Sequence, residues 1–227
     1  MNDMNEYTDQ GYANDLREIR TRLLLMVGRV EKMIDESIDA LVNRDIEKGE
    51  AVIAQDRSVN QDEVDLDAMC LTLLACRQPM ASDLRFVTFA MKMVTDLERI
   101  GDLAVNLSER AIDLAKEPPL APYHKIPRMG VVVRSMVRDA IDAFIEKDAV
   151  KARDVLTRDD EVDDLYHSVF RELLDLMTED HNNIHRCIHN QSVAKYLERM
   201  GDHSTNLAEQ VVFMLKGTDI RHPGLSS

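Results

Sequence analysis

The chain contains no tryptophan, and aromatic residues make up only 4% of its 227 residues. Glycine and proline are also scarce, at 8 and 6 residues. Sandwiches and barrels need many aromatic and β-branched strand residues and frequent Gly- or Pro-containing turns, so this composition disfavours an all-β fold. With 44% hydrophobic and 31% charged residues, the chain is typical of a helical globular protein that can bury a sizeable core.

Cysteine and long hydrophobic runs are equally limited. Cys70, Cys76 and Cys187 are odd in number and lack a Cys-x-x-Cys spacing. This disfavours a disulfide framework or a thiolate zinc site and favours a reducing compartment. The apolar run at 23–27 is far too short for a signal peptide or a membrane span. We therefore expect a cytoplasmic protein that reaches a membrane only through a partner.

Positive charge is in deficit, because 28 Lys and Arg oppose 42 Asp and Glu and leave a formal net charge of −14. Nucleic acids and anionic lipids attract proteins with an excess of Lys and Arg. We therefore expect no nucleic-acid partner. Cations and basic protein surfaces are better suited to this chain.

Apolar residues recur at steps of three and four along six segments, which is the pattern of helices with one buried face. The segments are 16–43, 45–76, 82–114, 128–146, 149–177 and 191–216. The sequence predicts an all-α fold of two tandem, pseudo-symmetric three-helix bundles with six long helices. The expected parts are a first bundle at 1–117, a Pro-rich linker at 118–127, a second bundle at 128–217 and a tail at 218–227.

The two halves also resemble each other residue by residue. SIDALV at 37–42 parallels AIDAFI at 140–145, at an offset of 103. LERIGD at 97–102 parallels LERMGD at 197–202, at an offset of 100. Because polar residues recur together with the apolar ones, we expect them to perform the same role twice.

Glu98 and Asp102 are spaced i, i+4, so they lie on one face of a helix, and Asn106 continues the column. The second half repeats this column as Glu198, Asp202 and Asn206. Carboxylates this close repel each other, whereas a bound cation would reverse that interaction. Hard cations take carboxylate and amide oxygens as ligands. The alternative is a solvated acidic face.

A second acidic column lies on the middle helix of each half. Asp56 with Asn60, and Asp159 with Asp163, are also spaced i, i+4 and could face the first column across the bundle. The metal-ligand candidates are therefore Glu98, Asp102, Glu198, Asp202, Asp56, Asn60, Asp159, Asp163, Asn106 and Asn206. Their oxygens suit Mg, Ca or Mn and, less selectively, Fe or Zn.

Gly101 and Gly201 each lie between the paired acids. A glycine inside a helix costs about 1 kcal/mol relative to alanine. Its repetition indicates a close approach to the backbone by a neighbouring helix or a ligand, and the spacing does not decide between them.

Histidines form a weaker signal. His181, His185 and His189 are spaced to chelate a transition metal if the segment is helical. However, the sequence DHNN at 180–183 predicts a loop or a helix cap, so capping or solvent exposure is the default interpretation. His203 follows Asp202 and is a candidate minor ligand or an ordinary, partly exposed histidine.

Several motifs together carry a family resemblance. They are RQP at 77–79, ASDLR at 81–85, the twin hexapeptides at 97–102 and 197–202, and the tail KGTD at 216–219 followed by Arg221 and His222. From about residue 16 to 222 the chain resembles the PhoU family.

The resemblance implies two pseudo-symmetric three-helix bundles, usually dimeric, with metal clusters at (Glu/Asp)-x-x-x-Asp motifs. By position, Glu98, Asp102, Glu198 and Asp202 match those motifs, and Asp56 and Asp159 match less securely. Asn60 stands where the second half has Asp163, so the first site could hold one carboxylate fewer.

The resemblance also implies a function. It suggests a negative regulator of phosphate uptake and of the phosphate-starvation response. Such a regulator acts as a metal-binding adaptor between the ATPase of a phosphate ABC transporter and a membrane sensor histidine kinase. A homodimer is expected, and no catalytic residue.

Two alternatives remain open at this point. A carboxylate-bridged di-metal enzyme would normally carry two Glu-x-x-His motifs on facing helices, and the sequence has none. A purely structural helical interaction protein would tolerate alanine at both motif glycines and gain stability from it.

Overall fold

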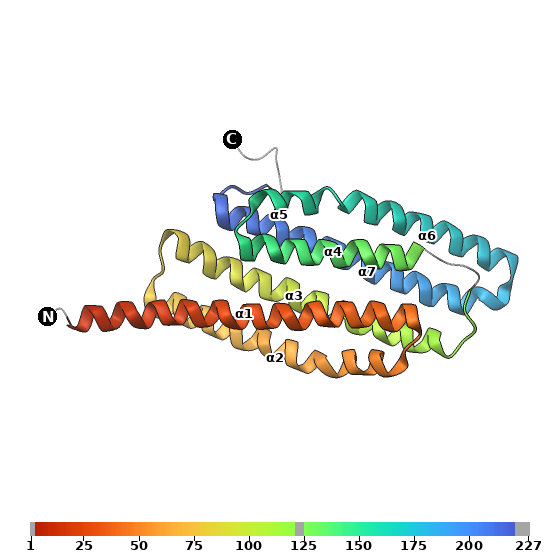
Figure 1. Cartoon of the computed structure of the whole chain (residues 1–227), viewed down its shortest axis with the longest axis horizontal. Helices are drawn as coiled ribbons and strands as arrows, with labels where there is room; N and C mark the ends of the chain where they lie inside the picture. The colour runs from red at the N-terminus through yellow and green to blue at the C-terminus, as the bar shows by residue number, and fades with distance from the viewer. Residues whose placement is uncertain (1–2, 121–124, 221–227) are drawn as a thin grey trace.

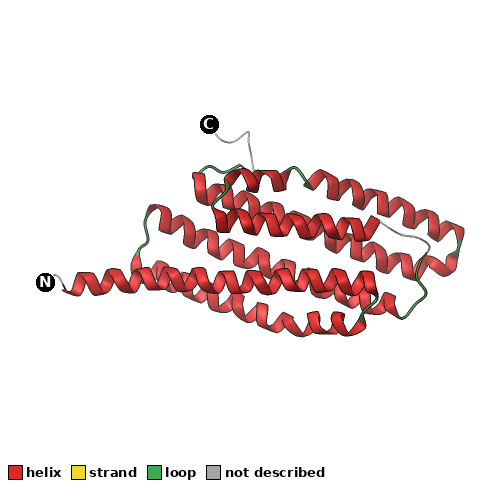
Figure 2. Cartoon of the chain, in the orientation of Figure 1, coloured by secondary structure: helices red, strands yellow, loops and turns green. Residues whose placement is uncertain are grey.

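The structure, a computed structural model, describes residues 3–120 and 125–220, with side chains described from residue 10 onward. Within these ranges the regular structure is entirely helical, as the apolar periodicity predicted (Figure 2). The α-helices are α1 (Asp3–Asn43), α2 (Ile46–Arg77), α3 (Ala81–Ala115), α4 (Lys125–Glu146), α5 (Ala149–Leu156), α6 (Asp159–Glu179) and α7 (Ile184–Lys216). A short 3₁₀ turn, η1 (His181–Asn183), precedes α7.

The helices form two elongated three-helix bundles that lie side by side (Figure 1). Helices α1, α2 and α3 build the first bundle, and α4 to α7 build the second, in which α5 and α6 together take the place of one helix. The bundles pack mainly through α3 against α7, with a smaller contact between α1 and α4. The predicted fold class is confirmed.

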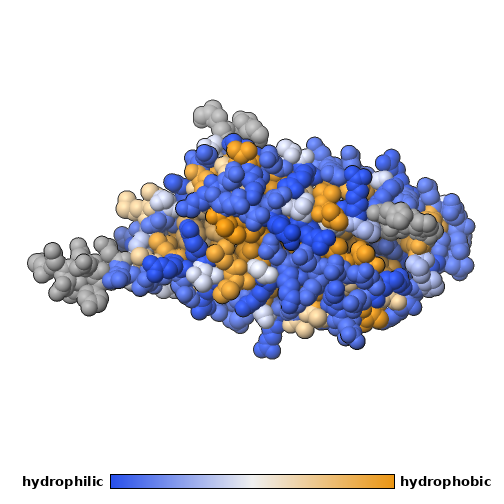
Figure 3. All heavy atoms as spheres, viewed as in Figure 1, coloured by the Kyte–Doolittle hydropathy of each residue, from blue (hydrophilic) through white to orange (hydrophobic). Residues whose placement is uncertain are grey.

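One hydrophobic core runs through both bundles. Its buried side chains come from all seven α-helices and form a single cluster. On the face shown in Figure 3, hydrophilic residues predominate and hydrophobic residues form separate patches. Within residues 3–120 and 125–220, no helix has the length and apolarity needed to cross a bilayer.

The duplication extends to the turns between helices. Asp45 and Asp148 cap α2 and α5 by accepting hydrogen bonds from backbone N–H groups three residues on, at 3.0 and 3.1 Å. The preceding residues, Arg44 and Lys147, both adopt the left-handed conformation, with φ values of 56° and 57°. Backbone hydrogen bonds to Asp148 hold the pKa of its carboxyl below its usual value. The repeat therefore determines backbone geometry as well as composition.

Several helix boundaries differ from the sequence prediction. α1 begins at Asp3 rather than near residue 16, and its N-terminal part is tied to other helices. The Tyr12 hydroxyl donates to Asp83 Oδ2 at 2.8 Å, and Arg77 pairs with Asp15 at 3.3 Å. Contacts of this kind stabilise a helix whose own sequence is polar.

The segment 149–177 is interrupted at Thr157 and Arg158. There the Arg158 guanidinium donates to Asp139 Oδ2 at 2.6 Å and to Ser135 Oγ at 3.0 Å, both on α4. These tertiary hydrogen bonds hold the chain in place where the helix breaks.

The predicted linker and tail are only partly described. α4 begins at Lys125, inside the predicted linker 118–127, and Pro127 lies in its first turn, where the missing N–H costs no intrahelical bond. Residues 121–124 and 221–227 lie outside the described residues.

The motif glycines face neighbouring helices. A Cβ at Gly101 would lie 3.4 Å from Val59 on α2, and a Cβ at Gly201 would lie 3.4 Å from Val162 on α6. The group that approaches is therefore a helix in both halves, and the distance is that of ordinary van der Waals contact. Gly49 is tighter, because its Cβ would lie 2.9 Å from Ile112 Cγ1.

The two kinds of glycine should respond differently to alanine. Gly101→Ala should raise the free energy of unfolding by about 0.5–1 kcal/mol, because helix propensity improves and the methyl group fits. Gly49→Ala should lower it by about 1 kcal/mol or more, because Ile112 must move. Urea denaturation of both variants measures this difference, and equal effects would contradict it.

A buried carboxylate ties the bundles together. Asp96 on α3 is only 8% exposed and accepts hydrogen bonds from His203 Nδ1 at 2.9 Å and Gln210 Nε2 at 2.7 Å, both on α7. His203, a candidate minor ligand from sequence, therefore takes part in the contact between bundles.

Asp96→Ala should lower the free energy of unfolding by about 1–3 kcal/mol, because two partly buried polar groups lose their partner. The exposed Asp154→Ala should change it by less than about 0.5 kcal/mol. Thermal denaturation compares the two, and a similar small effect in both would show that the hydrogen bonds contribute little.

Candidate metal centre

The first acidic site lies between α2 and α3. Asp102 on α3 is close enough to Asp56 on α2 for its negative charge to raise the pKa of that carboxyl, after the larger effect of burial. Burial and Asp102 likewise raise the pKa of Glu98, one turn earlier on α3. The structure thus brings the two columns together across the bundle.

The second site repeats this arrangement between α6 and α7. Burial, followed by the charges of Asp163 and Asp202, raises the pKa of Asp159. Burial, followed by Glu198 and Asp163, raises the pKa of Asp202. In both halves, negative charge accumulates between the middle and last helices.

Both sites contain a carboxylate oxygen without a hydrogen-bond donor. Glu98 Oε2 and Glu198 Oε2 are buried at equivalent positions, and neither makes a hydrogen bond. Their nearest cationic atoms are Arg99 Nε at 3.4 Å and Lys195 Nζ at 4.0 Å. Buried acceptors are normally satisfied. An oxygen-seeking cation would satisfy both, so the residues fit such an ion chemically.

Other candidates contribute less directly. Asn60 donates from Nδ2 to Asp56 Oδ2 at 3.0 Å, and its own buried Oδ1 has no hydrogen-bond partner. Asn106 donates to the backbone oxygen of Asp102 at 2.8 Å, whereas Asp163 and Asn206 are exposed. Among the described side chains, no group of three or more His, Cys, Asp or Glu surrounds a common point. A cation at either site would therefore require side-chain rotations.

The first site includes two acids that the sequence analysis missed. Glu63 and Asp67 extend the α2 column, and the pKa of Glu63 is raised by burial and then by Asp67 and Asp102. Asp67 Oδ1 is also buried without a hydrogen bond. The spacing Asp56, Asn60, Glu63, Asp67 follows one helix face, so it was readable from the sequence. Glu63 thus adds a carboxylate to the half in which Asn60 stands in place of an acid.

The second half has Tyr166 at the position equivalent to Glu63. Its hydroxyl accepts a hydrogen bond from Gln191 Nε2 at 3.0 Å, and Lys195 lies 5.9 Å from its ring centroid. The two sites therefore share their paired acids and differ at their edges.

The histidine segment is more helical than predicted. Asp180 does cap a turn, accepting from the Asn182 N–H at 2.9 Å, but α7 begins at Ile184 rather than near residue 191. His185 and His189 therefore lie one turn apart on α7, whereas His181 lies in η1. The predicted start of the last helix near residue 191 was therefore wrong, whereas the cap predicted at 180–183 is present.

A sequence model of the PhoU domain matches residues 23–111 and 126–211, one match in each bundle. The chain belongs to the PhoU family. The resemblance of the motifs to that family is thereby confirmed, and the twin acidic sites lie inside the two matched regions.

Individual relatives agree with this assignment. A curated protein of Pseudomonas putida named "Phosphate-specific transport system accessory protein PhoU homolog" is 40% identical over 98% of this chain and 87% of its own length. The crystal structure of PhoU from Pseudomonas aeruginosa is 39% identical, with a TM-score of 0.88 over 91% of this chain and 100% of its own. The phosphate transport system regulatory protein PhoU from Streptococcus pneumoniae is 27% identical, with a TM-score of 0.84 over 92% and 99%.

These names describe accessory and regulatory proteins, and PhoU is a non-enzymatic family. The expectation that the chain is not an enzyme is confirmed on that basis.

Because the acidic side chains lie close together, we expect the free energy of unfolding of the metal-free protein to depend on pH. The folded state raises the pKa of Glu98, so it binds that proton more tightly than the unfolded state does. Stability is therefore lost as pH rises through the interval between the unfolded and folded pKa values, and the loss is complete above it. In chelator at pH 7, Glu98→Gln should raise the free energy of unfolding by about 0.5 kcal/mol.

The gain should vanish at about pH 3, below the ordinary glutamate pKa of about 4.3. Denaturation at both pH values checks this, with the exposed Glu179→Gln as the matched control. A gain that is equal at the two pH values would contradict electrostatic repulsion as its cause.

Proposed function

We propose that this chain is an accessory protein of a phosphate-specific transport system and a negative regulator of the phosphate-starvation response. It acts in the cytoplasm, as a homodimer, as a metal-binding adaptor between the transporter ATPase and a sensor histidine kinase. Relatives named for the phosphate transport system support the first part. The observation that carries the metal-binding part is the duplicated acidic site with an unsatisfied glutamate oxygen in each copy.

Each site would hold its ion between two helices. In the first bundle the donors are Glu98 and Asp102 on α3, with Asp56 and Glu63 on α2. In the second bundle they are Glu198 and Asp202 on α7, with Asp159 and Asp163 on α6. Carboxylate oxygens suit Mg, Ca, Mn, Fe or Zn, and availability in the cell would select among them.

The bound ion supplies positive charge where the carboxylates repel one another. It thereby links the middle and last helices of each bundle and changes the charge that the site presents to a partner. A protein with a net charge of −14 favours basic partner surfaces, and local neutralisation would tune that attraction. The acids thus act through binding and charge, and no reaction is involved.

Metal content tests the ligand assignment. Natively purified protein should contain metal in stoichiometric amounts, measured by plasma mass spectrometry. The metal should be lost when alanine replaces Glu98, Asp102, Glu198 and Asp202. A charge-matched control replaces four exposed acids away from the sites: Glu50, Asp154, Asp175 and Glu179. Helical circular dichroism must be the same in all three proteins.

Equal metal content in the two variants would reject the assignment. Absence of metal from the wild type, even after soaking with divalent cations, would leave the acids as a solvated or partner-facing surface. The adaptor role is tested separately, by capture of the transporter ATPase and the kinase on the immobilised chain. Chelator or the four-site variant should weaken capture, and unchanged capture would separate partner binding from metal binding.

A further inference from the structure

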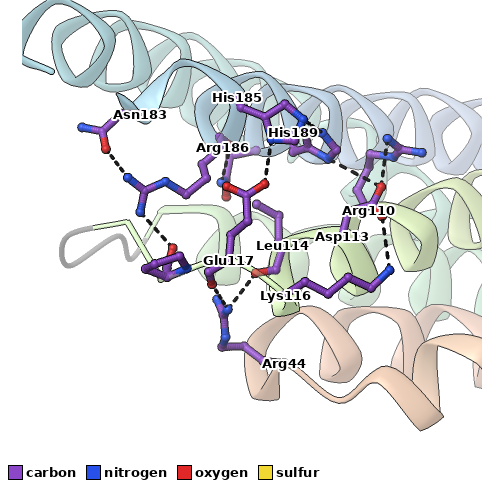
Figure 4. Close-up of polar contacts among 12 residues, drawn as sticks. Arg44, Arg110, Asp113, Leu114, Lys116, Glu117, Asn183, His185, Arg186 and His189 are labelled. Atoms are coloured by element: carbon purple, nitrogen blue, oxygen red, sulfur yellow. Dashed lines mark hydrogen bonds and ion pairs between the residues drawn. The ribbon is translucent and has the colours of Figure 1, made fainter. Parts of the chain in front are cut away.

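A histidine pair on α7 faces two carboxylates near the end of α3 (Figure 4). His185 Nδ1 lies 2.6 Å from Glu117 Oε1, and His189 Nδ1 lies 3.8 Å from Asp113 Oδ2. The two rings meet through their other nitrogens, with Nε2 atoms 3.3 Å apart. This cluster connects the two bundles and is separate from both acidic sites.

If both histidines are neutral, their two N–H protons cannot satisfy all the polar contacts of this cluster. His185 donates from Nδ1 to Glu117, so its Nε2 carries a lone pair. If His189 donates from Nε2 to that lone pair, its own Nδ1 lone pair faces the Asp113 carboxylate. His189 Nδ1 is in fact buried without a hydrogen-bond partner. If the proton instead sits on Nδ1, the two Nε2 lone pairs face each other at 3.3 Å.

We propose that His185 and His189 bind one late first-row transition-metal ion of the zinc class through their Nε2 atoms. The ion would accept both lone pairs, and both Nδ1–H groups could then point to Glu117 and Asp113. Two nitrogens bound to tetrahedral zinc at about 2.0–2.1 Å lie about 3.3 Å apart. The observed Nε2 separation matches that value, and the rings, whose centroids are 4.4 Å apart, need only turn so that both lone pairs point at the ion.

The carboxylates take the role of outer partners. Histidine ligands commonly donate their second N–H to a carboxylate, which fixes the ring and makes the binding nitrogen more basic. Glu117 already holds His185 in this way, and Asp113 lies on the corresponding side of His189. The protein thus supplies two nitrogen ligands, and water completes the coordination, since His185 is 67% exposed at the side chain.

Nearby cations shape the site in two ways. Arg44 and Arg186 donate to backbone oxygens at the end of α3, Leu114 at 2.7 Å and Pro118 at 3.0 Å, and so hold that end in place. Arg110 and Lys116 pair with Asp113 at 3.2 and 3.8 Å and partly offset its charge. The positive charges of these four side chains oppose a bound cation, so the binding energy must come from the imidazole nitrogens.

The same surroundings favour the neutral form of His189. Burial, followed by His185 and Arg110, lowers the pKa of His189. Neutral imidazole is the form that binds metal, so a lowered pKa of His189 weakens competition from protons. Because imidazole prefers Zn, Cu, Fe and Ni over Mg and Ca, the site should take a different ion from one held by carboxylates alone.

Zinc titration calorimetry in a large excess of Mg²⁺ tests the proposal, because Mg²⁺ fills oxygen sites and leaves imidazole free. The four-site alanine variant serves as background, so that the acidic sites do not contribute. In it, His185→Ala or His189→Ala should weaken zinc binding at least about tenfold, and Glu117→Ala by about 10–100-fold. His181→Ala, at an exposed position in η1, is the matched control and should leave binding unchanged.

Zinc should also raise the melting temperature of the background protein, because the ion binds the histidine pair only in the folded state, and this shift should disappear with His185→Ala. His185 is exposed, so its replacement leaves the core intact. Zinc binding that is equal in the His185→Ala, His189→Ala and His181→Ala proteins would overturn the proposal. The proposal would also be overturned if the background protein bound no zinc and the histidine pair titrated with protons alone.

Discussion

The packing of α3 against α7 is the contact on which the rest of the molecule depends. Each helix is the last of its bundle, and each carries one copy of the repeated hexapeptide. One face of α3 meets α7 through apolar residues and the Asp96–His203 hydrogen bond. Another face turns toward α2 and presents the acidic column there. The contact between α3 and α7 leaves their acidic columns facing α2 and α6, and it brings the histidine pair to the end of α3.

The acidic sites show a conflict between folding and binding. Burial and the charge of a neighbouring carboxylate raise the pKa of Glu98 and of Asp202, which destabilises the metal-free folded state. The glycine within each motif adds a further cost, although alanine would fit at ordinary contact distance from Val59 or Val162. Local choices that disagree with stability are expected where a site serves function. Their occurrence at equivalent positions in both halves makes accident a poor explanation.

Much of the fold was predictable, because helix periodicity and the 100-residue repeat are local or pairwise properties of the sequence. The errors fall where tertiary contacts override local signals. Polar residues before 16 join α1 because Tyr12 and Asp15 contact other elements, and Arg158 marks a break that apolar periodicity does not reveal. The start of α7 was placed too late because Asn and His are common in loops as well as at helix ends.

The sequence by itself determined which chemical groups share a helix face, because i, i+4 spacing has one meaning on any helix. That is why the paired acids and their duplication were identified, and why Glu63 and Asp67 could have been. Only the tertiary structure decided which helix faces which. His185 meets Glu117 across 68 positions of sequence, and His203 meets Asp96 across 107. Such contacts arise from the packing of helices against one another, which depends on the whole buried surface and leaves no fixed spacing in the chain.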